Sequence, residues 1–156
     1  MTPVVDTVSP STGTIYGGTT ITISGSYLNV DTPVVVIDSV PCVVNTPSIT
    51  STSFTCVTGE RLTMPNVNTF SVTVGPHNAI LNGKFEYVMR WSDIRTWGTD
   101  LPPVEGDLVY VPQGMTLYID QDTPILAGII VENGKLIFAD EKDLTINTYL
   151  ITLNGG

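Results

Sequence analysis

Apolar and polar residues alternate along several short stretches in the first part of the chain. Residues 19–24 alternate strictly, with Ile21 and Ile23 on one face, and residues 70–74 repeat the pattern. A period of two residues predicts half-buried β-strands. Other short apolar runs are separated by clusters of Gly, Pro, Ser and Asn, giving about seven strands, as in an immunoglobulin-like sandwich. Apolar residues at helical spacing do not continue for three turns anywhere.

The last part of the chain repeats itself. Gly114, Gly134 and Gly155 are separated by 20 and 21 residues, and apolar strand-like runs lie between them. Aligning the two repeats places Asp120 over Asp140, residues 129–131 over 150–152, and Asn133-Gly134 over Asn154-Gly155. A short period of this kind predicts the first rungs of a β-solenoid, each buried by stacking on its neighbour. The last rung has no visible cover, so we expect more β structure beyond it.

The composition agrees with an all-β fold. Val, Ile and Thr are abundant, and the chain contains 14 Gly and 11 Pro. These residue types favour strands and tight turns over helices. We therefore predict a sandwich at 2–88 and solenoid rungs at 89–156, with no flexible linker between them.

The first domain resembles IPT/TIG domains, the immunoglobulin-like modules of plexins, of large fibrocystin-type ectodomains and of some transcription factors. The motif is Val8-Ser9-Pro10, Gly13, Tyr16-Gly17-Gly18-Thr19, Ile21-Thr22-Ile23-Ser24-Gly25 and Tyr27. The resemblance implies the sandwich fold. Gly17 and Gly18 suit a structural turn, since neither a Lys nor a helix follows them as in a phosphate-binding loop.

The second domain is similar to the N-terminal part of the eight-glycine domain. The matching glycines are Gly106, Gly114, Gly134 and Gly155, in a frame that begins at Trp91-Ser-Asp and includes Leu101-Pro102-Pro103. The order of the two modules looks most like fibrocystin-L type ectodomains, which implies an extracellular or cell-surface location. Hyaluronan-degrading members of the same superfamily imply an alternative, a glycan-binding or glycan-processing module.

The charge excludes some partners. The net charge is −9, so the phosphates of nucleic acid and an anionic membrane surface would repel the chain. No apolar run reaches the length of a membrane span. The chain begins without a signal peptide, so for a secreted protein we expect the leader to lie outside this sequence.

Two cysteines, Cys42 and Cys56, lie in neighbouring strand-like segments. A disulfide between them would close a loop of about 15 residues and contribute about 3 kcal/mol. Two buried free thiols are the alternative. The pair also resembles the disulfide of extracellular IPT/TIG domains.

Acidic residues are the only reactive type in quantity. Asp120 and Asp122 form one cluster, and Asp140 and Asp143 form another one rung later. Stacking would bring the clusters together, so that they either lie at solvated corners or bind Ca²⁺. Their spacing does not match a calcium loop.

Both tryptophans, Trp91 and Trp97, lie where the two predicted domains join. Packing in the core of the first rung is one interpretation. The other is an exposed aromatic platform for a glycan.

Catalysis is not expected. His77 stands alone in a loop, and the acids lie on turns with no insertions to form a cleft. The sequence therefore predicts a structural or adhesion module without a cofactor, which assembles through β-stacking contacts. The expected partners are neighbouring domains of the same protein or identical chains placed end to end.

Overall fold

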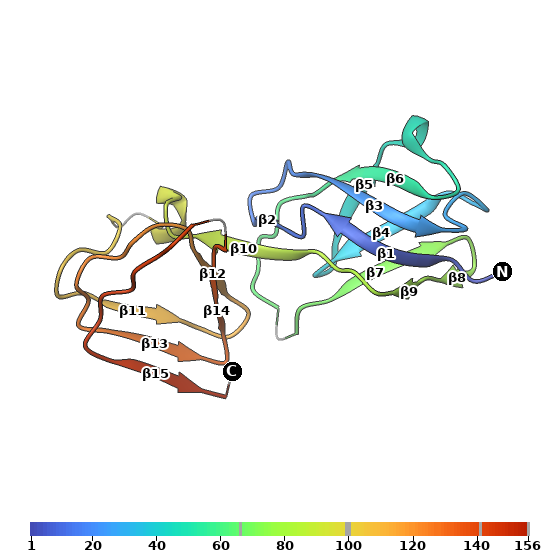
Figure 1. The fold of residues 1–156 in the computed structure, drawn as a ribbon. Coiled ribbons are helices and arrows are strands. Elements are labelled where there is room, and N and C mark those ends of the chain that lie inside the picture. Colours follow the sequence, from blue (N-terminus) through green and yellow to red (C-terminus); the bar gives the residue numbers. More distant parts are fainter. Residues whose placement is uncertain (66, 99–100, 141, 156) are drawn as a thin grey trace. The chain divides into compact units, whose positions relative to one another are not determined.

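The computed structural model describes residues 1–65, 67–98, 101–140 and 142–155, and these residues are almost entirely β-strands and loops (Figure 1). The last residue of the predicted second domain lies outside the described residues. Two 3₁₀ turns, η1 (Thr46–Ser48) and η2 (Ile94–Trp97), are the only helical elements among them. The predicted all-β class is confirmed.

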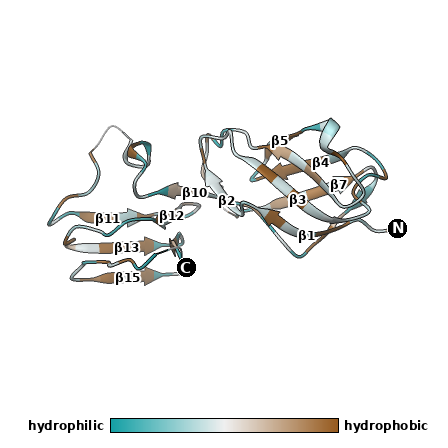
Figure 2. Ribbon diagram, turned by 45° about the horizontal axis from the view of Figure 1, so that its top comes forward, coloured by the Kyte–Doolittle hydropathy of each residue, from teal (hydrophilic) through white to brown (hydrophobic). Residues whose placement is uncertain are grey.

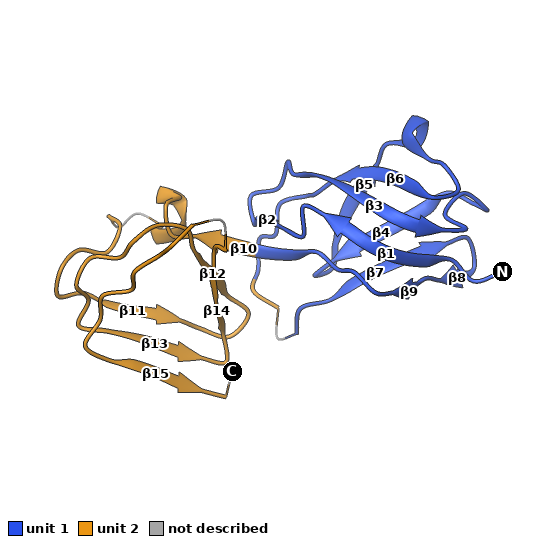
Figure 3. Cartoon of the chain, in the orientation of Figure 1, with its two compact units in different colours: residues 1–63, 67–87 blue, residues 64–66, 88–156 orange. Residues whose placement is uncertain are grey.

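The chain forms two compact units, which are described separately (Figure 3). The first contains residues 1–63 and 67–87, and the second contains residues 64–66 and 88–156. Strand β10 (Glu86–Arg90) runs from one unit into the other. The chain therefore passes between the units within a single strand.

The first unit is the immunoglobulin-like sandwich. Its strands are β1 (Val4–Ser9), β2 (Thr12–Thr14), β3 (Thr20–Ser26), β4 (Pro33–Ile37), β5 (Val40–Val44), β6 (Ser53–Val57), β7 (Phe70–Val74), β8 (His77–Asn78), β9 (Ile80–Leu81) and the start of β10. The pairing order is β8-β7-β4-β5-β6-β3-β1-β9. Only Ala79 separates β8 from β9, so one short segment occupies both ends of this order.

The sandwich core follows from the alternation in the sequence. Ile21 and Ile23 of β3 are fully buried, and Phe54 and Cys56 of the paired strand β6 are at most 1% exposed. The sulfurs of Cys42 and Cys56 form a disulfide inside this core, with 5.5 Å between the Cα atoms. The predicted disulfide is confirmed, and the alternative of free thiols is wrong.

The second unit is a stack of parallel strands, here called the parallel stack. It consists of the end of β10 with β11 (Leu108–Val111), β12 (Thr116–Ile119), β13 (Gly128–Glu132), β14 (Lys135–Phe138) and β15 (Ile151–Asn154). Strand β12 pairs with β10 on one side and with β14 on the other, and β13 lies between β11 and β15. All four of these pairings are parallel, and successive strands of the chain alternate between the two sheets.

The interior of the parallel stack is apolar. Trp91, Leu117, Ile119, Leu126 and Ile129 are among its fully buried side chains. Figure 2 shows hydrophobic residues, drawn in brown, along β13 and β15. Among the described residues, no helix is both long and apolar enough to cross a membrane.

Candidate functional site

Two columns of inward-facing side chains run through the sheet β11-β13-β15. The register forms them from Val109, Ile129 and Ile151, and from Val111, Val131 and Leu153. Exposure along the first column is 2%, 0% and 46%, and along the second 0%, 2% and 68%. Positions that are buried in β11 and β13 are thus exposed in β15, because no described strand pairs with the far side of β15.

The other sheet of the parallel stack ends in the same way. Ile119 of β12 is fully buried, whereas its partner Phe138 of β14 is 47% exposed. Phe138, Ile151 and Leu153 are here called the open end. A hollow of about 380 Å³ lies beside them, with Val131, Leu136 and Gly134 in its wall. No described strand covers the apolar side chains of the open end.

The opposite end of the stack is covered by the two tryptophans, here called the Trp cap. Trp91 is 1% exposed and packs in the core with Val109 and Val111. Trp97 meets it edge to face, with 5.0 Å between ring centroids, and its Nε1–H donates to the Trp91 carbonyl at 3.1 Å. The expected packing role is present. The hypothesis of a glycan platform is wrong for Trp91, because a buried ring cannot stack on a sugar.

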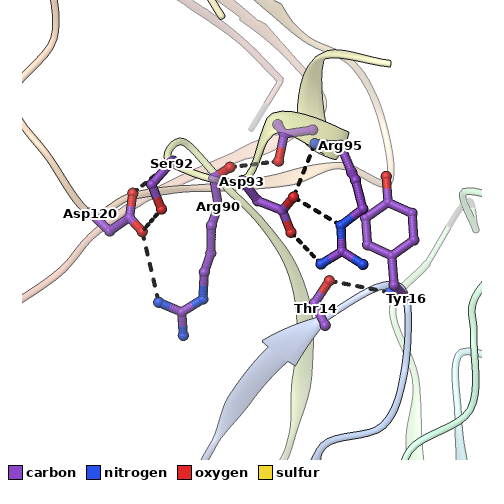
Figure 4. A network of polar contacts seen from close by, with 8 residues as sticks. Thr14, Tyr16, Arg90, Ser92, Asp93, Arg95 and Asp120 are labelled. Atoms are coloured by element: carbon purple, nitrogen blue, oxygen red, sulfur yellow. Dashed lines mark hydrogen bonds and ion pairs between the residues drawn. The ribbon is translucent and has the colours of Figure 1, made fainter. Parts of the chain in front are cut away.

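Polar contacts fix the Trp cap on strand β12 (Figure 4). The N–H of Trp91 donates to the Tyr118 carbonyl at 2.9 Å. Asp120 accepts from the N–H of Ser92 at 3.0 Å and from its hydroxyl at 2.5 Å. The guanidinium of Arg90 lies 3.9 Å from the same carboxylate and 5.0 Å from the Tyr118 ring centroid. Asp120 therefore orients the turn that carries Trp91.

A second carboxylate shapes the turn between the two tryptophans. Asp93 caps η2 by accepting from the backbone N–H of Arg95, and it forms a two-bond ion pair with the Arg95 side chain at 2.9 and 2.7 Å. These bonds from Arg95 lower the pKa of Asp93 below its usual value. The hydroxyl of Thr96 donates to the Arg90 carbonyl at 2.5 Å and closes the turn.

The observed register differs by one residue from the repeat alignment. Ile129 pairs with Ile151 rather than Leu150, and the N–H of Ala139 donates to Ile119, which places Ala139 rather than Asp140 beside Asp120. The step is 19 residues from Thr116 to Lys135 but 22 from Ile129 to Ile151. One constant period cannot fit both sheets, because the loop after Asp140 is longer than its counterpart.

The same shift separates the two asparagines that the repeat alignment placed over one another. Asn154 pairs with Glu132, so Asn133 does not lie opposite Asn154. Asn133 instead adopts a left-handed backbone conformation, with φ +57°, and its N–H donates to the Asn154 carbonyl. Its side-chain oxygen lies against Gly155, which also has positive φ. The left-handed backbone conformations of Asn133 and Gly155 and the backbone hydrogen bond between Asn133 and Asn154 therefore form this corner, rather than paired side-chain amides.

The acidic residues do not gather into a metal site. Asp122 accepts from the N–H of Thr145 at 2.8 Å, and Asp120 is engaged by Ser92. Asp140 and Asp143 are exposed. Within the described part of the chain, no group of three or more His, Cys, Asp or Glu residues could hold a metal ion. The geometry gives the calcium hypothesis no support.

Several of the predicted glycines are required by their surroundings, and Gly17 and Gly134 are two examples. Gly17 has φ +77°, and a Cβ there would lie 2.7 Å from the Gly59 carbonyl carbon. At Gly134 a Cβ would lie 2.5 Å from the Pro112 carbonyl oxygen, so the corners of successive repeats pack backbone to backbone. Of the other predicted glycines, Gly13 and Gly25 lie in strands, Gly106 and Gly114 lie in turns, and Gly18 lies in the irregular segment before β3.

Sequence reasoning missed a buried ion pair in the sandwich. Arg61 donates to Asp38 at 2.7 Å, and each side chain is 2% exposed. Asp38 also accepts from the N–H of Thr69 at 2.7 Å, and the Arg61 guanidinium lies 5.4 Å from the Tyr87 ring centroid. Burial, and then the nearby Asp38 carboxylate, raise the pKa of Tyr87. Local pattern could not reveal this cluster, because its members lie far apart in the sequence.

Comparison with known proteins agrees with the two units. The model of the IPT/TIG domain matches residues 3–87, and that of the G8 domain, the eight-glycine module, matches residues 96–156. Fibrocystin-L of Homo sapiens is 34% identical over 160 residues, which cover all of this chain and 4% of that protein. Fibrocystin of Canis lupus familiaris is 32% identical over 75 residues, covering 48% of this chain and 2% of that protein.

One similar solved structure is that of the plexin A4 extracellular region. Its sequence is 27% identical in the matched region, and the match covers 56% of this chain and 9% of that chain, with a TM-score of 0.49. The chain thus spans only a small part of the proteins that it matches. By the extent of the first family match, the chain belongs to the IPT/TIG family, and a G8 domain follows its IPT/TIG domain.

Proposed function

We propose that this chain is a non-enzymatic structural module of an extracellular protein, and that its parallel stack is the beginning of a β-solenoid. In this role the open end binds further β structure. That structure comes from a neighbouring part of the same protein or from an identical chain. The similarity to fibrocystin-L and the disulfide support the extracellular setting.

The observation that carries the proposal is the change in exposure along the inward columns. Ile129 and Val131 are 0% and 2% exposed, but Ile151 and Leu153, their partners in the last strand, are 46% and 68% exposed. Apolar side chains in core positions gain free energy when a further strand removes them from water. The backbone edge of β15 offers the hydrogen bonds for that strand.

The two ends of the stack are not equivalent. At the Trp cap, Trp91 already covers Val109 and Val111, so side chains stacked in line with this inward column would first have to displace a buried indole. At the open end nothing described has to move. The apolar core of the stack therefore favours extension in one direction, away from the Trp cap.

The carboxylates near the cap support a structural role over a catalytic one. Asp120 holds Ser92, and Asp93 holds Arg95, through short hydrogen bonds that fix the fold. Each carboxylate is committed to a neighbouring group, whereas glycoside hydrolysis requires a pair of acids facing a substrate. These contacts support the proposed structural role.

Thiol labelling at the open end tests the proposal. A Leu153→Cys variant is prepared in the 156-residue chain and in the longest natural polypeptide that contains it, and a Leu101→Cys variant serves as the control. We expect rapid labelling of position 153 in the short chain and strong protection in the long one, with position 101 labelled in both. Equal labelling of position 153 in both forms would contradict the proposal.

A further inference from the structure

A second hollow lies along the other edge of the sheet β11-β13-β15. Its volume is about 340 Å³, and it is lined by Trp97, Leu101, Pro103, Asp107, Leu108 and Tyr110. All of these residues belong to the second unit. The hollow therefore separates strand β11 from residues of the segment that precedes it.

Strand β11 is the terminal strand of its sheet. It pairs with β13 on one side, and no described strand pairs with its other side. A β-strand with a single neighbour leaves about half of its backbone N–H and C=O groups directed away from the sheet. The hollow thus lies beside hydrogen-bonding groups that suit an added strand.

The wall of the hollow is apolar and exposed. Leu101 is 81% exposed, Leu108 is 64% exposed and Tyr110 is 52% exposed. Leu108 lies over Gly128, whose missing side chain leaves it room, and the Tyr110 hydroxyl donates to Glu132 at 2.8 Å. Three large exposed side chains around one hollow are typical of a binding surface.

The charge around the hollow has one sign. Asp107 lines it, Glu105 is exposed just before β11, and Glu132 holds Tyr110. None of the described residues that line the hollow is Lys or Arg, and the whole chain carries a net charge of −9. A partner with basic side chains would be attracted, and an acidic one repelled.

We propose that the edge of β11 is a strand-addition site for an extended peptide that combines alternating apolar residues with Lys or Arg. The four residues of β11 span about 13 Å, so a segment of five or six residues covers the edge. Backbone hydrogen bonds to β11 hold the peptide. Alternate side chains pack on Leu108 and Tyr110, and the basic residues face Asp107 and Glu105. This site is separate from the open end and does not depend on the proposed assembly.

The test uses the whole 156-residue chain and the acetylated peptide Lys-Val-Thr-Val-Lys-Val, with binding followed by fluorescence anisotropy and by NMR shifts. One control peptide carries Glu in place of Lys, and another carries Pro in place of Thr, which removes a backbone N–H. We expect saturable binding that weakens at least about tenfold for each control peptide. The shifts should centre on the amides of residues 108–111 and on the Trp97 indole N–H.

Matched variants on the two edges of one sheet locate the site. Leu108→Lys should weaken binding at least about tenfold, because it removes an apolar contact and adds a positive charge, and Leu153→Lys on β15 should leave it unchanged. Unchanged one-dimensional NMR dispersion shows that each variant is folded. The proposal is overturned by absence of binding, by shifts centred on β15, or by equal binding of the Glu peptide. A neutral oligosaccharide that shifts residues 108–111 when the peptide does not would also overturn it.

Discussion

Replacing Arg61 by Met should destabilise the sandwich strongly. The guanidinium of Arg61 is 2.7 Å from Asp38, and both side chains are 2% exposed. Met keeps much of the apolar stem but removes the charge and its hydrogen bonds. Asp38 then stays buried with the backbone N–H of Thr69 as its remaining donor in this cluster.

The expected loss is about 3 to 4 kcal/mol. Removing one partner of a buried ion pair costs about 3 to 5 kcal/mol, because the other charge is left buried. The bond from Thr69 lowers the penalty, and the lost contact with the face of Tyr87 adds about 0.5 to 2 kcal/mol. For a small domain, each kcal/mol shifts Tm by about 4 to 8 °C.

The assay is urea unfolding followed by far-ultraviolet circular dichroism. The control is Arg95→Met, which removes another Arg–Asp pair with the same 2.7 Å distance, but with an arginine side chain that is 54% exposed. That change should cost less than about 1 kcal/mol, because water screens an exposed pair. A double variant, Asp38→Asn with Arg61→Met, should recover part of the loss.

The two ion pairs have the same distance, so burial is predicted to cause the difference in unfolding free energy between Arg61→Met and Arg95→Met. The reasoning is refuted if Arg61→Met costs less than about 1 kcal/mol, or if Arg95→Met costs as much. It is also refuted if the double variant is less stable than Arg61→Met, since the unpaired carboxylate would then not be the cause.

Three further predictions concern other parts of the chain. Gly134→Ala should destabilise the parallel stack by at least about 2 kcal/mol, because the added Cβ would lie 2.5 Å from the Pro112 carbonyl oxygen. The measurement is urea unfolding followed by tryptophan fluorescence, and an unchanged unfolding curve would contradict the close packing. Serine at both positions of the disulfide should lower the urea midpoint by the equivalent of about 3 kcal/mol; no decrease would show that the loop is not restrained in the unfolded chain. Asp93 should titrate by NMR below the usual value of about 3.9, so its stabilisation is present above that pH and is lost as the pH falls through the lowered pKa. Arg95→Gln should return the pKa of Asp93 toward its usual value, and no return would exclude Arg95 as the cause.

The sandwich could be predicted because its signals are local. Alternation around Ile21 and Ile23 fixes which face of β3 is buried, whereas the two-residue strands β8 and β9 carry no such signal. The disulfide also follows from two cysteines in neighbouring strands. By contrast, Asp38 and Arg61 are 23 residues apart and meet only when a hairpin and a long loop are folded. No sequence window contains that information.

The parallel stack shows where a periodic pattern stops being informative. The repeat predicted parallel stacked strands, but a one-residue error in register moves every side chain to the opposite face. The repeat alignment pairs Val131 with Thr152 instead of Leu153. It therefore does not reveal that an exposed leucine continues this inward column. The sequence allows two interpretations of Trp91, a core side chain or an exposed platform, and the burial of its ring in the structure distinguishes them.

Amide hydrogen exchange of β15 tests the central claim most directly. It is measured for the 156-residue chain as a monomer and for the longest natural polypeptide that contains it, with β13 as the internal reference. We predict that the amides of Ile151–Asn154 exchange much faster than those of Gly128–Glu132 in the short chain, and equally slowly in the long one. Slow exchange of β15 in the short monomer, or fast exchange in both forms, would contradict an open end that binds further β structure.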